Sequence, residues 1–208
     1  METHDYLQLV PIQSTGFEIE AEASIEITVG DPLALFSLAK DRLLNVKNWH
    51  KTAGIVSADF QIVEKDGNEP VRPIRKGDYM RVDIPGPGSK EGDGYDWVTA
   101  EELKEYQQGD VQSVGFRVRP VSNPLSEKDV IAHFYDEAST SSFIITREGK
   151  RITASIIDSN IKPNDEAASL TDKLRNTAVG VSAIASFSKI QWQKLADGLI
   201  AIVEDNEG

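Results

Sequence analysis

The stretch GFEIEAEASIEITVGDP (residues 16–32) alternates apolar and polar side chains without interruption. The odd positions from 17 to 29 are all apolar, and the even positions carry four glutamates: Glu18, Glu20, Glu22 and Glu26. A period of two is typical of a strand with one face in the core and the other in solvent. The stretch therefore predicts a long antiparallel strand at the start of the fold.

A row of glutamates on one strand face could collect cations or a basic partner, or it could be the solvated side of a sheet. Carboxylates two residues apart on a strand lie about 7 Å from each other, too far to share a calcium ion without ligands from neighbouring strands or loops. A solvated outer face needs only the alternation itself. We therefore interpret the row as an outer face, whose charge also opposes sheet stacking and aggregation.

The period changes to that of a helix directly after this strand. Asp31 and Pro32 provide an N-cap and a first-turn proline, and residues 33–44 (LALFSLAKDRLL) predict a helix of about three turns. Residues 46–54 (VKNWHKTAG) predict a second short helix or turn, which ends at Gly54. Two short helices are thus expected between the first strand and the rest of the sheet.

Most of the chain from residue 57 to residue 158 carries strand-like patterns separated by turn signals. They predict six further strands, in residues 57–64, 77–84, 111–120, 129–137, 142–148 and 150–158. The last two form a hairpin around Glu148 and Gly149. Together with the first strand, they predict an α+β fold class with a seven-stranded antiparallel, curved sheet.

Residues 95–110 (YDWVTAEELKEYQQGD) interrupt this series of strands. Thr99 and Glu102 have the spacing of a capping box, which favours a short helix. An exposed edge strand would also fit the pattern. We expect a helix, although residues 95–107 could be either a helix or a strand. A flexible loop is expected before it, in residues 87–94 (PGSKEGDG).

Helical periodicity returns near the C-terminus. One apolar face comprises Leu170, Leu174, Ala178, Val181 and Ala185. Ser188 and Gln191 then have capping-box spacing, which predicts a break or kink near Ser188. A second amphipathic helix is expected after it, with Trp192, Leu195, Leu199 and Ile202 on its apolar face.

The bulk composition limits the classes of function. The 208 residues suit one domain over residues 17–203, with a loose lead-in (1–16) and an acidic tail (204–208). With 22 basic and 34 acidic residues, the net charge of −12 disfavours nucleic acid and anionic membrane surfaces as partners. There is no cysteine, no apolar segment near 20 residues and no basic leader, so we expect a cytoplasmic protein without membrane insertion.

The predicted element order, together with LALFSLAKDRLLNVKNWHKTAG (residues 33–54) and its Asn48-Trp49 pair, resembles the START-like helix-grip superfamily of lipid-transfer and polyketide-cyclase-type proteins. The resemblance covers most of the chain and implies a curved sheet that grips the C-terminal helix over an apolar cavity. It also implies binding of a small hydrophobic molecule, or chaperone-like contact with a partner. The insert around Trp97, the Pro-Gly loop and the break at Ser188 depart from the family pattern.

Four residues are candidate ligand contacts: Trp49, Arg117, His133 and Tyr135. Each has a plainer alternative. Buried aromatic residues usually serve the core, Arg117 and its neighbour Arg119 could pair with acidic residues across the sheet, and a lone histidine on a strand is usually structural. The three histidines (His4, His50 and His133) have no metal-ligand spacing, no nucleophile or phosphate-loop motif occurs, and nothing points to a cofactor.

These observations favour a non-catalytic binder of a small hydrophobic ligand, held between the sheet and the C-terminal helix. The alternative is an interaction or assembly protein with a solid core that acts through its surface. A third reading is a cyclase- or hydratase-type enzyme that uses His133 or a pocket carboxylate. A protein partner and a homodimer formed through an edge strand both stay open.

Overall fold

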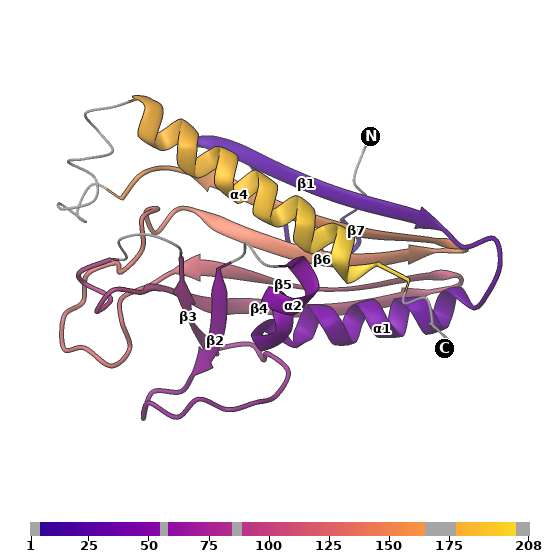
Figure 1. Ribbon diagram of the computed structural model, residues 1–208, viewed down its shortest axis with the longest axis horizontal. Helices are drawn as coiled ribbons and strands as arrows, with labels where there is room; N and C mark the ends of the chain where they lie inside the picture. The colour runs from indigo at the N-terminus through magenta and orange to yellow at the C-terminus, as the bar shows by residue number, and fades with distance from the viewer. Residues whose placement is uncertain (1–4, 55–57, 85–88, 165–177, 203–208) are drawn as a thin grey trace.

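Seven antiparallel strands form one sheet in the order β1-β7-β6-β5-β4-β3-β2. The computed structural model describes residues 5–54, 58–84, 89–164 and 178–202. The strands are β1 (Phe17–Glu26), β2 (Asp59–Val63), β3 (Tyr79–Asp83), β4 (Asp96–Gln108), β5 (Val111–Pro120), β6 (Thr140–Glu148) and β7 (Arg151–Ile161). Because β1 pairs with β7 and β2 forms the opposite edge, the chain crosses the whole sheet between its first two strands (Figure 1).

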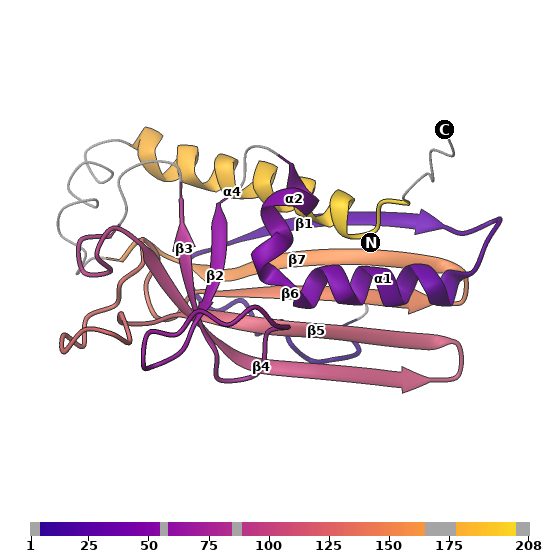
Figure 2. The same ribbon diagram turned by 60° about the horizontal axis from the view of Figure 1, so that its bottom comes forward.

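The helices cover one face of this sheet, here called the inner face (Figure 2). They are α1 (Pro32–Leu44), the 3-10 turn η1 (Val46–Asn48), α2 (Trp49–Ala53) and the long α4 (Ala178–Leu199). Two short helical segments after β1 and one terminal helix on a curved antiparallel sheet make up the helix-grip arrangement. The predicted fold class is therefore confirmed.

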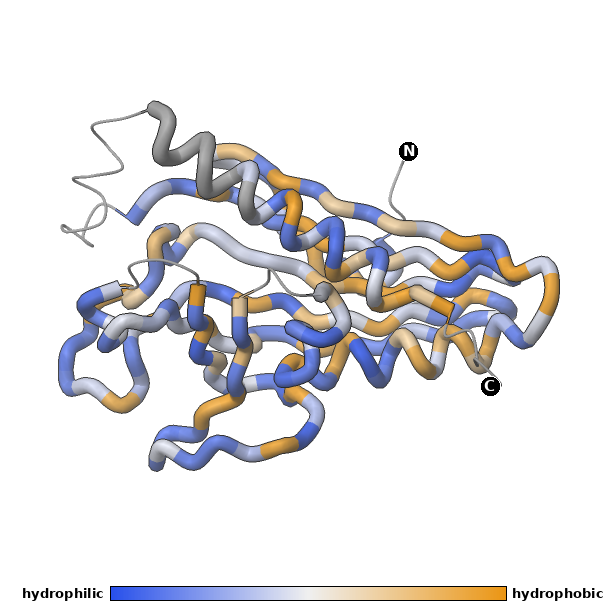
Figure 3. The backbone as a smooth tube through the Cα atoms, viewed as in Figure 1, coloured by the Kyte–Doolittle hydropathy of each residue, from blue (hydrophilic) through white to orange (hydrophobic). Residues whose placement is uncertain are grey.

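The alternation that predicted β1 has the expected physical meaning. Ile19 and Ala21 are buried on the inner face, whereas Glu18, Glu20 and Glu26 are exposed. Figure 3 shows the corresponding change between hydrophilic and hydrophobic residues along the strand. The glutamate row is thus the solvated face of an edge strand, as interpreted from its spacing.

The predicted boundaries of the first helices are also confirmed. The carboxylate of Asp31 accepts a hydrogen bond of 2.9 Å from the amide of Leu33, and Pro32 occupies the first turn of α1. Gly54 ends α2 with a φ of 83°, a conformation that side chains with a Cβ rarely adopt. Local capping chemistry therefore sets these boundaries.

An aromatic core lies between the inner face and the helices. The ring of Trp49 lies 5.0 Å from Phe60, 5.9 Å from Phe116 and 4.8 Å from Phe143 between centroids, and Phe143 lies 5.3 Å from Trp192. Aromatic pairs at such distances add to the burial energy of their surfaces. This cluster joins α2 and α4 to three strands of the sheet.

The C-terminal end of α4 is held closely against the other helices. A Cβ at Gly198 would lie 1.9 Å from the carbonyl oxygen of Thr52, so only glycine permits this approach to α2. The guanidinium of Arg42 donates to the carbonyl oxygens of Gly198, Leu199 and Ala201, and a cation at this end also complements the helix dipole. None of the helices within the described ranges is long and apolar enough to cross a membrane.

The prediction of a break at Ser188 is wrong, because α4 runs through this residue without interruption. Both residues of the expected capping box make long-range contacts instead. Ser188 is buried close to the phenol of Tyr135, and the side-chain oxygen of Gln191 accepts from the amide of Ala58 at 3.1 Å. Ile202 lies beyond the helix and is exposed.

The rest of the predicted C-terminal apolar face cannot be compared with the structure. Leu170 and Leu174 lie outside the described residues, as do the acidic tail (204–208) and His4. The side chains of residues 178–185 are likewise not described.

The expected helix in residues 95–107 is also wrong, since this segment forms β4 and pairs with both β3 and β5. A β-bulge between Ala100 and Glu102 explains the misreading. Inner-face residues are even-numbered before the bulge, as in Val98 and Ala100, whereas after it Leu103 packs on the core. The extra residue breaks the period of two on which strand prediction depends.

Residues 129–137 were expected to be a strand but form none. The sheet still has the predicted seven strands, because β4 takes the place of this one. Only isolated bridges occur there, from Ile131 to Ser122 and from Tyr135 to Pro163. The ring nitrogen Nδ1 of His133 accepts the amide hydrogen of Tyr135 at 2.9 Å. A local side-chain bond of this kind competes with the ladder that a strand would require.

Residues 5–16, expected to be a loose lead-in, lie across the outer face of the sheet. Leu7 and Leu9 are buried there against Ile144. A Cβ at Gly115 would lie 2.9 Å from a methyl group of Leu9, so this glycine makes room for the segment. The carbonyl oxygen of Leu9 accepts hydrogen bonds from Arg117 and from Ser142, which ties the segment to β5 and β6.

Candidate functional site

A group of mostly buried polar side chains lies beneath α4, at the end of the inner face from which this helix begins. We call it the Asp158 cluster. Its members come from the segment between β5 and β6, from β6, from β7 and from α4: Tyr135, Ser141, Asp158, Ser188 and Trp192. Residues far apart in sequence thus converge on one carboxylate.

Strand register places Asp158 on the inner face. It pairs with Ser141 of β6, which in turn pairs with the core residue Val118 of β5, and it follows Ile156 at the two-residue spacing of one strand face. Its exposure is only 2%. The carboxylate therefore continues an otherwise apolar row along β7.

The two oxygens of the Asp158 carboxylate differ in their contacts. Oδ2 accepts a hydrogen bond of 2.8 Å from the indole Nε1 of Trp192. Oδ1 is buried and has no hydrogen-bond partner among the residues that the structure describes. An unsatisfied buried polar atom of this kind usually requires an explanation, such as water, a ligand or a functional role.

The environment of Asp158 disfavours its charged form. Burial raises the pKa of this carboxyl to about 6, although the nearby hydroxyl of Ser141 and the hydrogen bond from Trp192 oppose the rise. No lysine or arginine of the described segments forms an ion pair with it. The group therefore titrates near neutral pH and carries a desolvation cost that no cation offsets.

Tyr135 forms the second side of the cluster. Its ring packs with Ile19 and Ile161 in a small apolar group next to the main core. Burial, followed by the negative charge of Asp158, raises the pKa of this phenol above its usual value, while the nearby hydroxyl of Ser188 opposes the rise. The phenol is therefore a neutral hydroxyl at physiological pH.

Ser141 lies at the margin of the cluster. Its side chain lies on the inner face beside Asp158, yet the residue is only half-buried. The neighbouring core residue Val118 is buried by contrast. Ser141 is thus the least buried member of the cluster.

Of the four residues proposed from the sequence, the structure brings only Tyr135 into this cluster. Trp49 lies in the aromatic core, and its Nε1 donates to the carbonyl oxygens of Arg42 and Leu43. Arg117 lies on the outer face, where it pairs with Glu101 and donates to Leu9. The alternative of ion pairing across the sheet is thus confirmed for Arg117.

His133 is buried next to Tyr135 in sequence but serves the backbone there. Because its Nδ1 accepts the amide hydrogen of Tyr135, this nitrogen carries no proton. Burial lowers the pKa of the imidazole to about 3. The ring stacks on Phe134 at 4.4 Å between centroids and is neutral at physiological pH.

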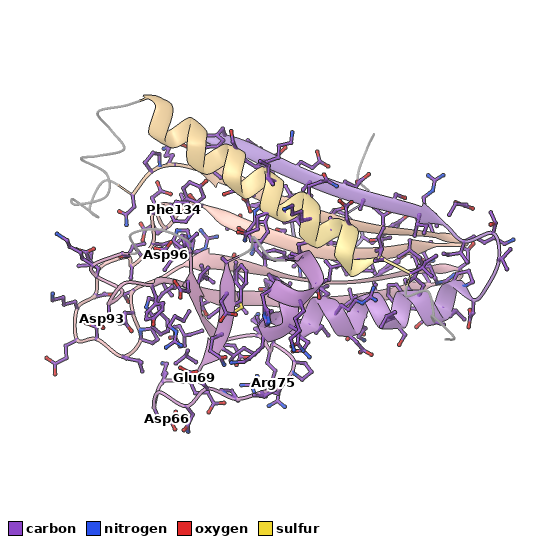
Figure 4. All side chains as sticks on the ribbon, viewed as in Figure 1. Asp66, Glu69, Arg75, Asp93, Asp96 and Phe134 are labelled. Carbon is purple, nitrogen blue, oxygen red and sulfur yellow. The ribbon has the colours of Figure 1, made fainter. Side chains whose placement is uncertain are left out.

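Asp96 is a second buried carboxylate on the inner face. It pairs with the core residue Val82 at the start of β4, and its exposure is 1%. Burial raises the pKa of this carboxyl to about 8, and Oδ1 has no partner within the described part of the chain. Figure 4 shows Asp96 and Phe134 toward the end of the molecule at which α4 begins.

Neither carboxylate was singled out from the sequence, although the signal was present. Asp158 follows Ile152, Ala154 and Ile156 at even positions that face the core. Asp96 precedes Val98 and Ala100 in the same way. A charged residue at a position whose parity faces the core indicates a buried charge, and such groups are enriched at functional sites.

No family model matches the chain, and no curated protein matches it. Among solved structures, hypothetical protein jhp0584 from Helicobacter pylori is similar with a TM-score of 0.48 at 11% identity, over 88% of this chain and 87% of that one. A norcoclaurine synthase point mutant from Thalictrum flavum has a TM-score of 0.34 at 12% identity (88% and 98% covered). Ara h 8.0201 has a TM-score of 0.32 at 16% identity (86% and 97% covered).

Proposed function

We propose that this protein binds a small, mainly apolar molecule between the inner face of the sheet and α4, without catalysing a reaction. The observation that carries the proposal is the Asp158 cluster itself. Small-molecule sites are typically apolar with a few convergent polar groups. Here a carboxylate, hydroxyl groups and an indole converge among aliphatic and aromatic side chains.

The energetic cost of the cluster supports a role in binding. A buried carboxylate without a cation destabilises a folded protein, and an apolar residue at position 158 would continue the row of Ile152, Ala154 and Ile156. Proteins commonly keep such destabilising groups where function needs them. Ser141 is the least buried member of the cluster, so we expect a ligand to enter on its side.

An assembly protein with a solid core is the second candidate function. It is favoured by the packing of Trp49, which is buried among Phe60, Phe116 and Phe143. This part of the inner face is filled by the protein's own side chains. A ligand would therefore occupy the end of the sheet near Asp158 and Ser141.

The experiment that tests binding begins with native mass spectrometry of the purified protein, followed by extraction and identification of any released molecule. A panel of fatty acids, alcohols, amines and flat aromatic compounds is then screened for a rise in melting temperature. We expect either a stoichiometric adduct or at least one stabilising compound. A bare mass together with a panel in which no compound stabilises the protein would overturn the proposal.

A pair of variants locates the site. Ser141→Leu places a larger side chain on the inner face beside Asp158, whereas Ser24→Leu makes the same change at an exposed position of β1. We expect Ser141→Leu to weaken binding by about tenfold or more, as loss of complementarity in a pocket does, and Ser24→Leu to leave it unchanged. Equal affinity in both variants would contradict the proposed location.

A further inference from the structure

The unpartnered oxygen Oδ1 of Asp158 indicates which chemical group a ligand would present to it. Oδ2 is already bound by Trp192, whereas Oδ1 is buried and accepts no hydrogen bond from the described residues. Since a carboxylate oxygen accepts hydrogen bonds, the group that satisfies Oδ1 must be a donor. We infer that the bound molecule presents a hydroxyl or a protonated amine to Oδ1 of Asp158. This inference rests on the proposed function.

No described neighbour of Asp158 supplies the missing donor. The indole of Trp192 has a single N–H, which is used on Oδ2. The hydroxyls of Ser188 and Ser141 are nearby, but neither donates a hydrogen bond to Oδ1. No described lysine or arginine forms an ion pair with it. No described side chain therefore competes with a ligand for Oδ1.

The same arrangement excludes another class of ligand. A carboxylate on the bound molecule would lie beside the carboxylate of Asp158, and like charges at short range in a buried site repel strongly. The site is thus selective for alcohols and amines against acids with the same apolar part.

Chain-matched probes test this selectivity directly. We would measure by calorimetry at pH 8 the affinities of 1-octanol, octylamine and octanoate, which share one apolar chain and differ in the headgroup. We expect octanol or octylamine to bind about tenfold more tightly than octanoate, since one buried hydrogen bond to a charged group has this effect. A preference for octylamine over octanol identifies the ammonium as the donor, and the reverse order identifies the hydroxyl.

Asp158→Asn is the decisive variant. The asparagine oxygen can still accept from Trp192, while its amide replaces the acceptor Oδ1 by a donor. We expect the preference for the donor probes to fall to about threefold or less, and octanoate to gain affinity. Two controls keep the preference of the wild-type protein: Asp41→Asn, which is exposed on α1, and Asp96→Asn, which removes the other inner carboxylate.

The outcomes separate the two proposals. If octanoate binds as tightly as the other probes, or if Asp158→Asn keeps the wild-type preference, the inference about the headgroup is wrong while ligand binding stands. If none of the three probes binds the wild-type protein, the protein does not bind their common apolar chain, and both proposals lose their support.

Discussion

The indole of Trp192 donates a hydrogen bond of 2.8 Å to the carboxylate of Asp158, and this single contact joins the middle of α4 to the end of β7. Trp192 also packs against Phe60 and Phe143 in the aromatic core. One residue therefore connects the packed part of the inner face with the Asp158 cluster. The strength of this connection depends on the charge of Asp158, because a hydrogen bond to a charged acceptor is stronger than one to a neutral group.

Replacement of Trp192 by phenylalanine keeps an aromatic ring but removes the donor. At pH 8, where Asp158 is largely ionised, we expect the free energy of unfolding to fall by about 2–3 kcal/mol, from the lost bond and reduced packing. At pH 5 the loss is smaller, because the carboxyl is then protonated. Urea titrations at both pH values measure the difference. An equal loss at pH 5 and pH 8 would mean that only packing is affected.

Asp158→Asn tests the charge of the cluster through stability. Burial raises the pKa of Asp158 from 3.8 to about 6, so the folded protein binds a proton that the unfolded chain releases between these values. The free energy of unfolding therefore falls as the pH rises through this range. We expect Asp158→Asn to remove this fall. The free energy of unfolding of the variant, minus that of the wild type, should therefore be about 1–2 kcal/mol larger at pH 8 than at pH 5.

Asp96→Asn should act over a wider pH range. Since burial raises the pKa of Asp96 to about 8, the wild-type protein continues to lose stability from this group above pH 7. We expect the advantage of Asp96→Asn to grow by about 1 kcal/mol between pH 7 and pH 9, while that of Asp158→Asn stays constant there. Guanidinium titrations of both variants distinguish the two carboxyl groups. Parallel curves for the two variants would refute the assignment.

Gly198→Ala tests the contact between α4 and α2. Alanine is the better helix former by about 1 kcal/mol, yet its Cβ would lie 1.9 Å from the carbonyl oxygen of Thr52. We expect the steric effect to dominate and the protein to lose about 1–3 kcal/mol of stability, as overpacked sites do. Lys194→Ala, at an exposed position of the same helix, is the control and should be close to neutral. A stabilised Gly198→Ala would show that the two helices can separate freely.

The sequence predicted those parts of the fold that depend on local chemistry. The alternation of β1, the cap at Asp31 and the glycine at position 54 act within a few residues, and all three were interpreted correctly. The errors arose where distant residues decide. Residues 96–108 form a strand despite the bulge near Glu101, because they pair with two neighbouring strands. Ser188 and Gln191 do not form the expected capping box, because their side chains contact Tyr135 and Ala58.

The candidate site was harder to predict for the same reason. Tyr135 was proposed from its apparent place on a strand, although it reaches the cluster from an irregular segment. Asp158 could have been found from its parity in β7, but its contact with Trp192 spans the chain from residue 158 to residue 192. Sequence periodicity assigns a residue to a face and does not identify its partner on another element.

The position of β1 in the sheet has a consequence for the order of folding. Its ladder partner is β7, where Ile25 pairs with Ile152, so the first strand is synthesised long before the strand that completes its pairing. Closing so large a loop is entropically costly and slows folding. During this interval an unpaired strand with Ile19 and Ile25 exposed could aggregate. The alternating glutamates of β1 give this segment a negative charge, which opposes aggregation while the strand is unpaired.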